Sequence, residues 1–93
     1  MLYEFDSLEW DEKKRLDTLA DRDLDFADAW QVLADNLQIT FQSPQNGEER
    51  FKTIGLLNGD LVAVIHMPRG RNCRIISLRR AHQNEEEAYY GNC

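Results

Sequence analysis

The sequence predicts an α+β protein, with two helices in the N-terminal third, antiparallel strands in the middle and a last helix at the end. Apolar residues recur at helical spacing between residues 11 and 36. Three β-rich runs joined by short turns follow between residues 50 and 80. The 93 residues are 42% hydrophobic and 30% charged, which suits a single globular domain over residues 1–93.

The two N-terminal helices are predicted from their caps and their apolar faces. Ser7 and Asp11 are both suitable N-caps for a first helix over about residues 11–21. Asp25 is the expected N-cap of a second helix that ends near residue 36. The apolar stripe of that helix is Phe26, Ala29, Trp30 and Leu33. Stacking of these aromatic rings and of Trp10 on RNA bases is the alternative, but helical spacing favours core packing.

The strands are predicted from alternation and composition, at residues 2–5, 37–41, 50–57, 61–65 and 73–80. Residues 61–65 are apolar at every position, which is typical of a central strand covered on both faces. A third helix is expected from His82 to about Tyr90.

Two short turns set the predicted strand register. Asn58-Gly59 is typical of a type I′ hairpin turn, which places Phe51 opposite His66. The next turn lies within residues 68–72, and its length is left open by the sequence. A two-residue turn at residues 69–70 would place Arg74 on the face of Arg50 and Lys52. A five-residue loop would place Arg74 beside His66.

Charge is divided unevenly along the chain. Seven of the eleven lysines and arginines lie between residues 50 and 80, whereas thirteen of the seventeen acids precede residue 50. The chain carries a net charge of −6, which argues against non-specific nucleic-acid binding by the whole surface. A basic sheet and an acidic helical half are therefore predicted.

Several classes of protein are disfavoured by composition. No apolar run approaches the roughly 18 residues of a membrane span, and no signal peptide is predicted. Two cysteines do not make a disulfide framework, so a cytoplasmic location is expected. Gly-rich phosphate loops, Cys/His metal patterns and Ser nucleophile motifs are missing. The acidic runs 21–23 and 85–87 are interpreted as solvated charge rather than as a cation site.

Four blocks of residues have a distinctive type and spacing: Glu9-Trp10-Asp11-Glu12 with Lys14; Leu24-Asp25-Phe26 with Ala29; Gly47-Glu48-Glu49-Arg50-Phe51 with Thr53-Ile54-Gly55; and Arg74-Ile75-Ile76-Ser77 with Arg79 and Ala81. With these blocks, the chain resembles the BrnT family of ribonuclease toxins over residues 8–89. The resemblance implies a RelE-like fold, in which an antiparallel sheet of three to five strands is backed by the two N-terminal helices. It also implies RNA cleavage with neither metal nor cofactor, and neutralisation by a BrnA-like antitoxin. Symmetric dimerisation of that antitoxin predicts a 2:2 heterotetramer.

The candidate site residues combine this resemblance with the chemistry of RNA cleavage. The 2′-hydroxyl needs a base, and the charge on phosphorus needs cations, for which the planar arginine fork is well suited. The catalytic candidates are Arg50, His66, Arg74 and Arg79. The RNA-binding candidates are Lys52, Arg69, Arg71, Arg80 and Tyr89. The alternatives are salt bridges for the cations, strand-end packing for His66, and packing on the sheet for the Tyr89 ring.

A second function stays open beside the ribonuclease. The family usually has Asn and Lys-His-Gly where this chain has Thr18 and residues 21–23, and its last helix is often basic rather than acidic. Both departures remove positive charge near the expected RNA path. The alternative function is therefore a catalytically silent BrnT-like module that binds the antitoxin and acts as corepressor.

Overall fold

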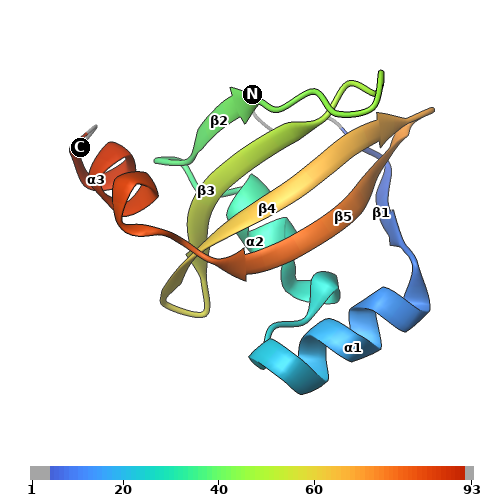
Figure 1. Ribbon diagram of the computed structural model, residues 1–93, viewed down its shortest axis with the longest axis horizontal. Coiled ribbons are helices and arrows are strands. Elements are labelled where there is room, and N and C mark those ends of the chain that lie inside the picture. Colours follow the sequence, from blue (N-terminus) through green and yellow to red (C-terminus); the bar gives the residue numbers. More distant parts are fainter. Residues whose placement is uncertain (1–4, 92–93) are drawn as a thin grey trace.

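The computed structural model describes residues 5–91, which form a five-stranded mixed sheet with three α-helices and one 3-10 turn. In chain order the elements are β1 (Ser7–Trp10), α1 (Glu12–Arg22), the 3-10 turn η1 (Phe26–Asp28), α2 (Trp30–Leu33), β2 (Ile39–Gln42), β3 (Phe51–Leu57), β4 (Asp60–Arg69), β5 (Asn72–Arg80) and α3 (Gln83–Gly91). The strand order is β1-β5-β4-β3-β2 (Figure 1). The α+β class and the C-terminal helix are confirmed, and the likeness to the RelE fold stays a prediction.

The β3–β4 hairpin has the register that its turn predicts. Asn58 and Gly59 both adopt positive φ angles, 50° and 89°, as a type I′ turn requires. Phe51 pairs with His66 at the far end of the hairpin. β4 is the central strand, and its residues 62–64 are buried, as their apolar run predicts.

The β4–β5 hairpin decides which way Arg74 faces. Its turn is Gly70-Arg71, one residue later than the two-residue turn considered from the sequence. Both turns contain two residues, so this shift does not change the face of the sheet on which each β5 side chain lies. Arg74 lies opposite Met67, on the face of the sheet that carries Lys52, and on the other face from His66.

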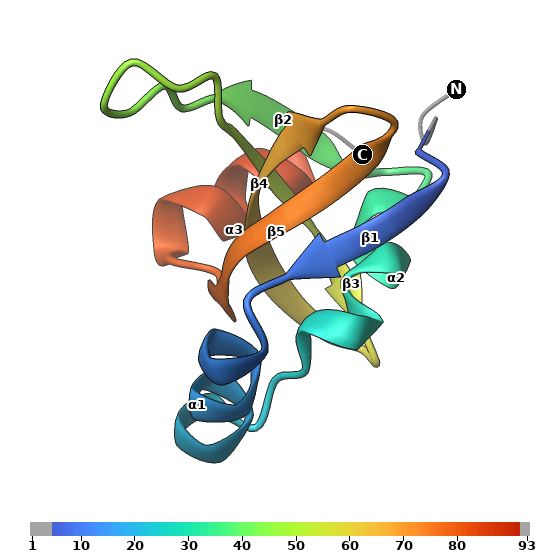
Figure 2. The same ribbon diagram turned by 90° about the vertical axis from the view of Figure 1, so that its right-hand side faces the viewer.

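The sheet is not purely antiparallel, because β1 runs parallel to β5 at one edge (Figure 2). The prediction of an antiparallel sheet is corrected here. β1 occupies Ser7–Trp10, so Ser7, one of the two N-cap candidates, lies in a strand, and Asp11 is the cap of the first helix. The strand predicted at residues 2–5 lies almost wholly outside the described residues, and Phe5 itself is not in a strand. The partner of β1 lies more than sixty residues away, at Asn72 and beyond, and local patterning gives no sign of it.

The first helix forms where predicted but does not back the sheet. The Asp11 side chain accepts hydrogen bonds from the backbone N–H groups of Lys13 and Lys14, and Asp23 caps the C-terminal end with a φ of 58°. No residue of α1 is buried, and the helix lies beyond the end of the sheet (Figure 1). Its last turn is attached to β5, because Arg22 donates to the Leu78 carbonyl.

The second predicted helix is broken into η1 and α2. Asp25 caps η1 by accepting a hydrogen bond from the Ala27 N–H, as expected. The continuous stripe is wrong at one position: Trp30 is 51% exposed, and Val32 is fully buried instead. The segment before Ala29 is a 3-10 turn, which has about three residues per turn rather than 3.6, so the spacing of a continuous α-helix does not apply across it. Of the two N-terminal helices, only this broken one therefore packs on the sheet.

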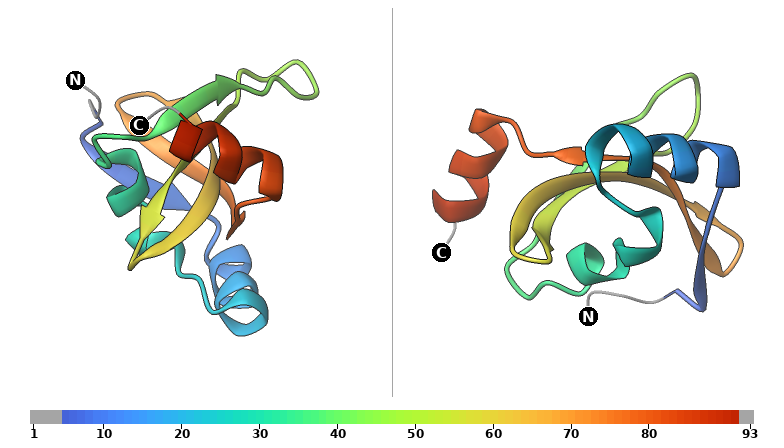
Figure 3. Two further views of the ribbon diagram at one scale, coloured as in Figure 1. Left: turned by 90° about the vertical axis from the view of Figure 1, so that its left-hand side faces the viewer. Right: turned by 90° about the horizontal axis from the view of Figure 1, so that it is seen from below.

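The sheet has two faces with different cover (Figure 3). The core face packs on η1 and α2 and holds the main apolar cluster, which includes Phe26, Val32, Val64 and Leu78. The opposite face, called the α3 face below, packs on α3 through a small cluster of Ile54, Ala63 and Tyr89. Away from this cluster the α3 face carries half-buried and charged side chains, and the candidate site lies there.

Candidate functional site

Two groups of charged side chains lie on the α3 face. The first, called the Glu85 cluster, joins Lys52 of β3, Arg79 of β5 and Glu85 of α3. The second, called the Glu9 cluster, joins Glu9 of β1, Arg69 of β4 and Arg74 of β5. The strand register brings both groups to this face from segments far apart in the sequence.

The Glu85 cluster is tightly hydrogen-bonded. Arg79 donates from Nη1 to Glu85 Oε1 at 2.8 Å and from Nη2 to Oε2 at 2.9 Å, a two-pronged geometry. Lys52 Nζ lies 2.8 Å from Oε2, and the His82 N–H donates to Oε1 at 2.8 Å. The Arg79 hydrogen bonds are the largest cause that holds the pKa of Glu85 well below its usual range. The carboxylate is 3% exposed, so this cluster anchors the start of α3.

The Glu9 cluster has the opposite character. The guanidiniums of Arg69 and Arg74 both lie 3.9 Å from Glu9 Oε1, which is too far for a hydrogen bond. Among residues 5–91, neither guanidinium donates a hydrogen bond to a protein group. The Arg69 side chain is 57% exposed and that of Arg74 is 26% exposed. Strand register brings the two guanidiniums close to Glu9, and their N–H donors are available to a ligand.

The remaining basic residues of the sheet are also paired. Arg50 contacts Glu48 at 2.7 Å, Arg71 contacts Asp6 at 2.6 Å, and Arg80 lies 3.7 Å from Asp60. Arg50 also lines a cavity of about 320 Å³ in the loop before β3, together with Gln42, Pro44, Gly47, Glu48 and Glu49. All seven cations between residues 50 and 80 therefore have a carboxylate within 3.9 Å. The basic sheet predicted from charge counts is largely neutralised by acids from other elements.

His66 lies on the core face, away from both clusters. Its Nε2 is 2.8 Å from the Thr53 hydroxyl, its Nδ1 is 3.6 Å from the thiol of buried Cys73, and its ring stacks on Phe51. The side chain is 6% exposed, and burial lowers its pKa to about 4. The sheet thus separates the proton-transfer residue expected from sequence from the arginines expected to work with it.

Tyr89 lies on the buried side of α3, against the sheet, and is not presented to a ligand. It is 2% exposed, and its hydroxyl donates to Asp35 Oδ2 at 2.7 Å. The same carboxylate oxygen accepts from the Leu56 N–H. Tyr89 therefore joins α3 to β3 and to the end of α2, which agrees with the alternative of packing on the sheet.

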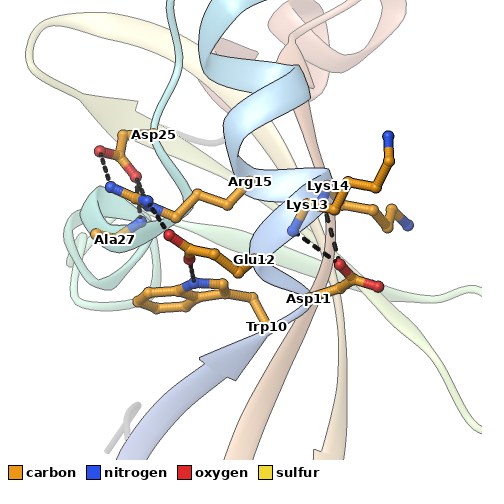
Figure 4. A network of polar contacts seen from close by, with 8 residues as sticks. All are labelled: Trp10, Asp11, Glu12, Lys13, Lys14, Arg15, Asp25 and Ala27. Carbon is orange, nitrogen blue, oxygen red and sulfur yellow. Dashed lines mark hydrogen bonds and ion pairs between the residues drawn. The ribbon is translucent and has the colours of Figure 1, made fainter.

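A network of polar contacts near the start of the chain joins Trp10, Glu12, Arg15 and Asp25 (Figure 4). Trp10 donates from its indole N–H to Glu12, and Glu12 accepts from Arg15. Arg15 also donates to Asp25, the cap of η1. This chain of contacts fixes the end of β1, the first turn of α1 and the start of η1 relative to one another. These side chains hold the edge strand β1 in place beside β5.

Sequence reasoning missed the two carboxylates at the centre of the clusters. Glu9 stood within a distinctive block but had no assigned chemistry, and Glu85 stood in a run of three acids that suggested solvated charge. The position of Glu85 near the start of the predicted helix was a partial signal, because a glutamate at the third helical position often accepts a hydrogen bond from the backbone N–H of the N-cap residue. The signal for Glu9 would have required knowledge of the β1–β5 pairing.

Within residues 5–91, no group of three His, Cys, Asp or Glu side chains is arranged to share a metal ion. None of the helices in the same part of the chain is long and apolar enough to cross a membrane.

The fold and site define a small α+β protein with a pair of arginines on one face of its sheet. The guanidinium N–H groups of this pair make no hydrogen bond to the described part of the protein. The family described as "Ribonuclease toxin, BrnT, of type II toxin-antitoxin system" matches residues 10–85. The chain therefore belongs to the BrnT family of ribonuclease toxins, and a protein antitoxin is the partner that such a system implies. A search of the curated proteins found no match.

Proposed function

We propose that this chain is an endoribonuclease that cleaves RNA without a metal, by attack of the 2′-hydroxyl on the adjacent phosphodiester. The observation that carries the proposal is the Glu9 cluster, in which two arginine forks from neighbouring strands converge with their donors uncommitted. Arginine matches phosphate oxygens at two positions and retains its charge at every working pH. Cations at this place stabilise the additional negative charge that develops on phosphorus.

The Glu9 cluster suits this role better than the Glu85 cluster. A phosphate that binds Arg69 and Arg74 replaces contacts of 3.9 Å on partly exposed side chains. A phosphate that binds Arg79 would have to displace Glu85 from hydrogen bonds of 2.8 and 2.9 Å. We therefore assign phosphate binding to Arg69 and Arg74, and anchoring of α3 to Arg79 and Lys52. Arg50, Arg71, Arg80 and Tyr89 lie outside both clusters, and we propose no catalytic role for them or for His66.

The test is cleavage of a short RNA by the purified chain in EDTA, compared with Arg74→Ala. Loss of one charged donor to a reacting centre lowers the rate by roughly 100-fold or more, so Arg74→Ala is expected to cleave about 100-fold more slowly. Lys14→Ala is the control, because it removes one positive charge from exposed α1 and should leave the rate unchanged. Wild-type activity that requires a divalent metal, or equal rates for both variants, would contradict the proposal.

The partner we propose is a BrnA-like antitoxin in a 2:2 complex in the cytoplasm. The exposed helix α1 and the acidic segments around it offer a surface separate from the α3 face, and charge complementarity would speed the encounter. Two-fold symmetry is the commonest way to build such an assembly. Light scattering of the co-purified pair measures the stoichiometry, and the mass of a simple heterodimer would contradict the tetramer.

A second function is favoured by one observation, the pairing of all seven sheet cations with carboxylates. A face with little net charge suits a module that binds the antitoxin and acts as corepressor without cleaving RNA. The same assay separates the two functions. A wild-type chain that binds its antitoxin but leaves RNA intact would establish the silent module.

A further inference from the structure

We propose that Glu9 is the general base of the reaction, the group that removes the proton from the attacking 2′-hydroxyl. The inference rests on the proposed ribonuclease function and adds a catalytic residue to it. Glu9 lies between the two arginines assigned to phosphate binding, on the same face of the sheet. Three separate strands supply the three side chains.

The position of Glu9 is firmly fixed by β1. Glu9 pairs directly with Arg74 in the parallel β1–β5 ladder. On the N-terminal side, the Ser7 hydroxyl donates to Asn72 at 2.9 Å. On the C-terminal side, the Trp10 indole is tied to Glu12. A carboxylate on a strand held at both ends can serve as a positioned base, because catalytic geometry must be kept within a fraction of an ångström.

The hydrogen bonding of the Glu9 carboxylate is incomplete. Its Oε1 is shielded from solvent and has no hydrogen-bond partner, and it is the one buried side-chain oxygen or nitrogen among residues 5–91 in that condition. Its Oε2 accepts a long hydrogen bond of 3.4 Å from Asn72. A buried acceptor without a donor is costly, roughly 1–3 kcal/mol, and calls for a functional explanation. A ribose hydroxyl from the substrate is a donor of the right kind.

Glu85, the other carboxylate on this face, differs from Glu9 in hydrogen bonding and in exposure. Both carboxylates lie between two cations, but Glu85 accepts close hydrogen bonds on both oxygens and is 3% exposed. The Glu9 side chain is 31% exposed, and the guanidinium of Arg69, whose side chain is 57% exposed, lies 3.9 Å from its Oε1. When the two guanidiniums move onto a phosphate, Oε1 becomes accessible beside the ribose that carries that phosphate. Glu85 has no comparable opening.

The proposed step balances in atoms and charge. Glu9 Oε1 takes the proton of the 2′-hydroxyl while the 2′-oxygen forms a bond to phosphorus. The bond from phosphorus to the 5′-oxygen breaks, and that oxygen takes a proton from solvent water. The products are a 2′,3′-cyclic phosphate and a free 5′-hydroxyl. Glu9 then returns its proton to solvent, while Arg69 and Arg74 neutralise the charge on the phosphate oxygens throughout.

The experiment compares wild type with Glu9→Gln, which preserves shape and removes the basic oxygen. Cleavage of a short RNA in EDTA gives the rate, and fluorescence anisotropy with a 2′-deoxy copy of that RNA gives the affinity. Loss of a general base lowers rates by roughly 100- to 10,000-fold, so we expect a loss of at least about 100-fold with affinity unchanged or increased. Asp60→Asn is the matched control, because Asp60 lies 3.7 Å from Arg80 at the other end of the sheet.

The pH dependence of the rate supplies a second readout that a structural role would not change. The wild-type rate should fall at acid pH, and Glu9→Gln should lack that dependence. The charged groups that face Glu9 are Arg69 of β4 and Arg74 of β5. Glu9→Asp, which keeps a carboxylate one methylene shorter, should retain part of both the rate and the acid limb.

Three results would overturn the inference. A Glu9→Gln rate within about threefold of wild type would remove the base role and leave the ribonuclease function intact. A loss of affinity as large as the loss of rate would make Glu9 a positioning residue for the arginines. A wild-type chain that leaves RNA uncleaved would reject the ribonuclease function itself, and the base role with it. Thermal unfolding of each variant establishes that all comparisons are made on folded protein.

Discussion

Replacement of Arg79 by alanine is expected to destabilise the fold strongly, and more than replacement of Glu85 by glutamine. Arg79→Ala leaves the Glu85 carboxylate, 3% exposed, with Lys52 and the His82 N–H as its partners. Two charge-assisted hydrogen bonds of 2.8 and 2.9 Å are lost. Removal of one partner from a buried pair costs about 3–5 kcal/mol, and because Lys52 remains we expect about 3 kcal/mol.

Glu85→Gln is expected to destabilise the fold less than Arg79→Ala, because the Arg79 side chain is more exposed than that of Glu85. The Arg79 side chain is 25% exposed, so in Glu85→Gln water can hydrate its guanidinium. We expect Glu85→Gln to cost about 1–2 kcal/mol, close to the net worth of hydrogen bonds to a charged group. In a protein of this size about 1 kcal/mol corresponds to 4–8 °C in Tm. Arg79→Ala should therefore lower Tm by about 12–24 °C.

Urea unfolding followed by circular dichroism at pH 7 measures both losses. The difference between wild type and Glu85→Gln should shrink as pH falls. The pKa of Glu85 in the folded protein lies below its ordinary value of 4.5, so its contribution is complete above that value and is lost as pH falls through the folded pKa. Losses below 1 kcal/mol for Arg79→Ala, or a larger loss for Glu85→Gln, would refute the assignment of this pair as the anchor of α3.

Two further predictions concern stability. Burial keeps His66 neutral with a pKa of about 4 against an ordinary 6.5, so the unfolded chain binds more protons between these values. The free energy of unfolding should therefore fall by about 1.5 kcal/mol between pH 6.5 and 5. Urea titrations of His66→Gln should show a flatter pH profile. A methyl group added at Gly55 would lie 3.0 Å from both the Val32 side chain and the Val32 carbonyl oxygen, so Gly55→Ala should cost about 1–3 kcal/mol in the same assay. Gly91→Ala, which meets nothing within 4 Å, is its control and should change little.

The parts of the fold that were predictable from sequence are those with local causes. The β3–β4 register follows from the conformational preferences of Asn58 and Gly59, and the start of α1 follows from the Asp11 cap. The parallel pairing of β1 with β5 has no local cause, because its stability comes from a strand more than sixty residues away. The burial predicted for Trp30 is wrong because α2 has only four residues, and so short a helix does not continue the apolar stripe of a longer one.

The candidate site was predictable only in its cations. Arginines at positions such as 74 and 79 are visible in the sequence, but the acid that each one meets depends on register and on the path of α3. From charge counts along the chain, Glu85 was interpreted as part of an acidic tail. In the structure it forms ion pairs with Lys52 and Arg79. His66 was a candidate because its ordinary pKa suits proton transfer. Burial on the core face changes that pKa and removes the side chain from the arginines.

The two clusters on the α3 face also differ in the free energy needed to admit a phosphate. Partly exposed ion pairs such as those of Arg69 and Arg74 with Glu9 contribute about 0–1 kcal/mol each. Separation of Arg79 from buried Glu85 costs about 3 kcal/mol or more. A phosphate should therefore prefer the Glu9 cluster by about 2 kcal/mol, which corresponds to roughly 30-fold in affinity. Under the proposed function, an acidic protein would bind RNA at this place, because the pairing of Arg69 and Arg74 with Glu9 is weak.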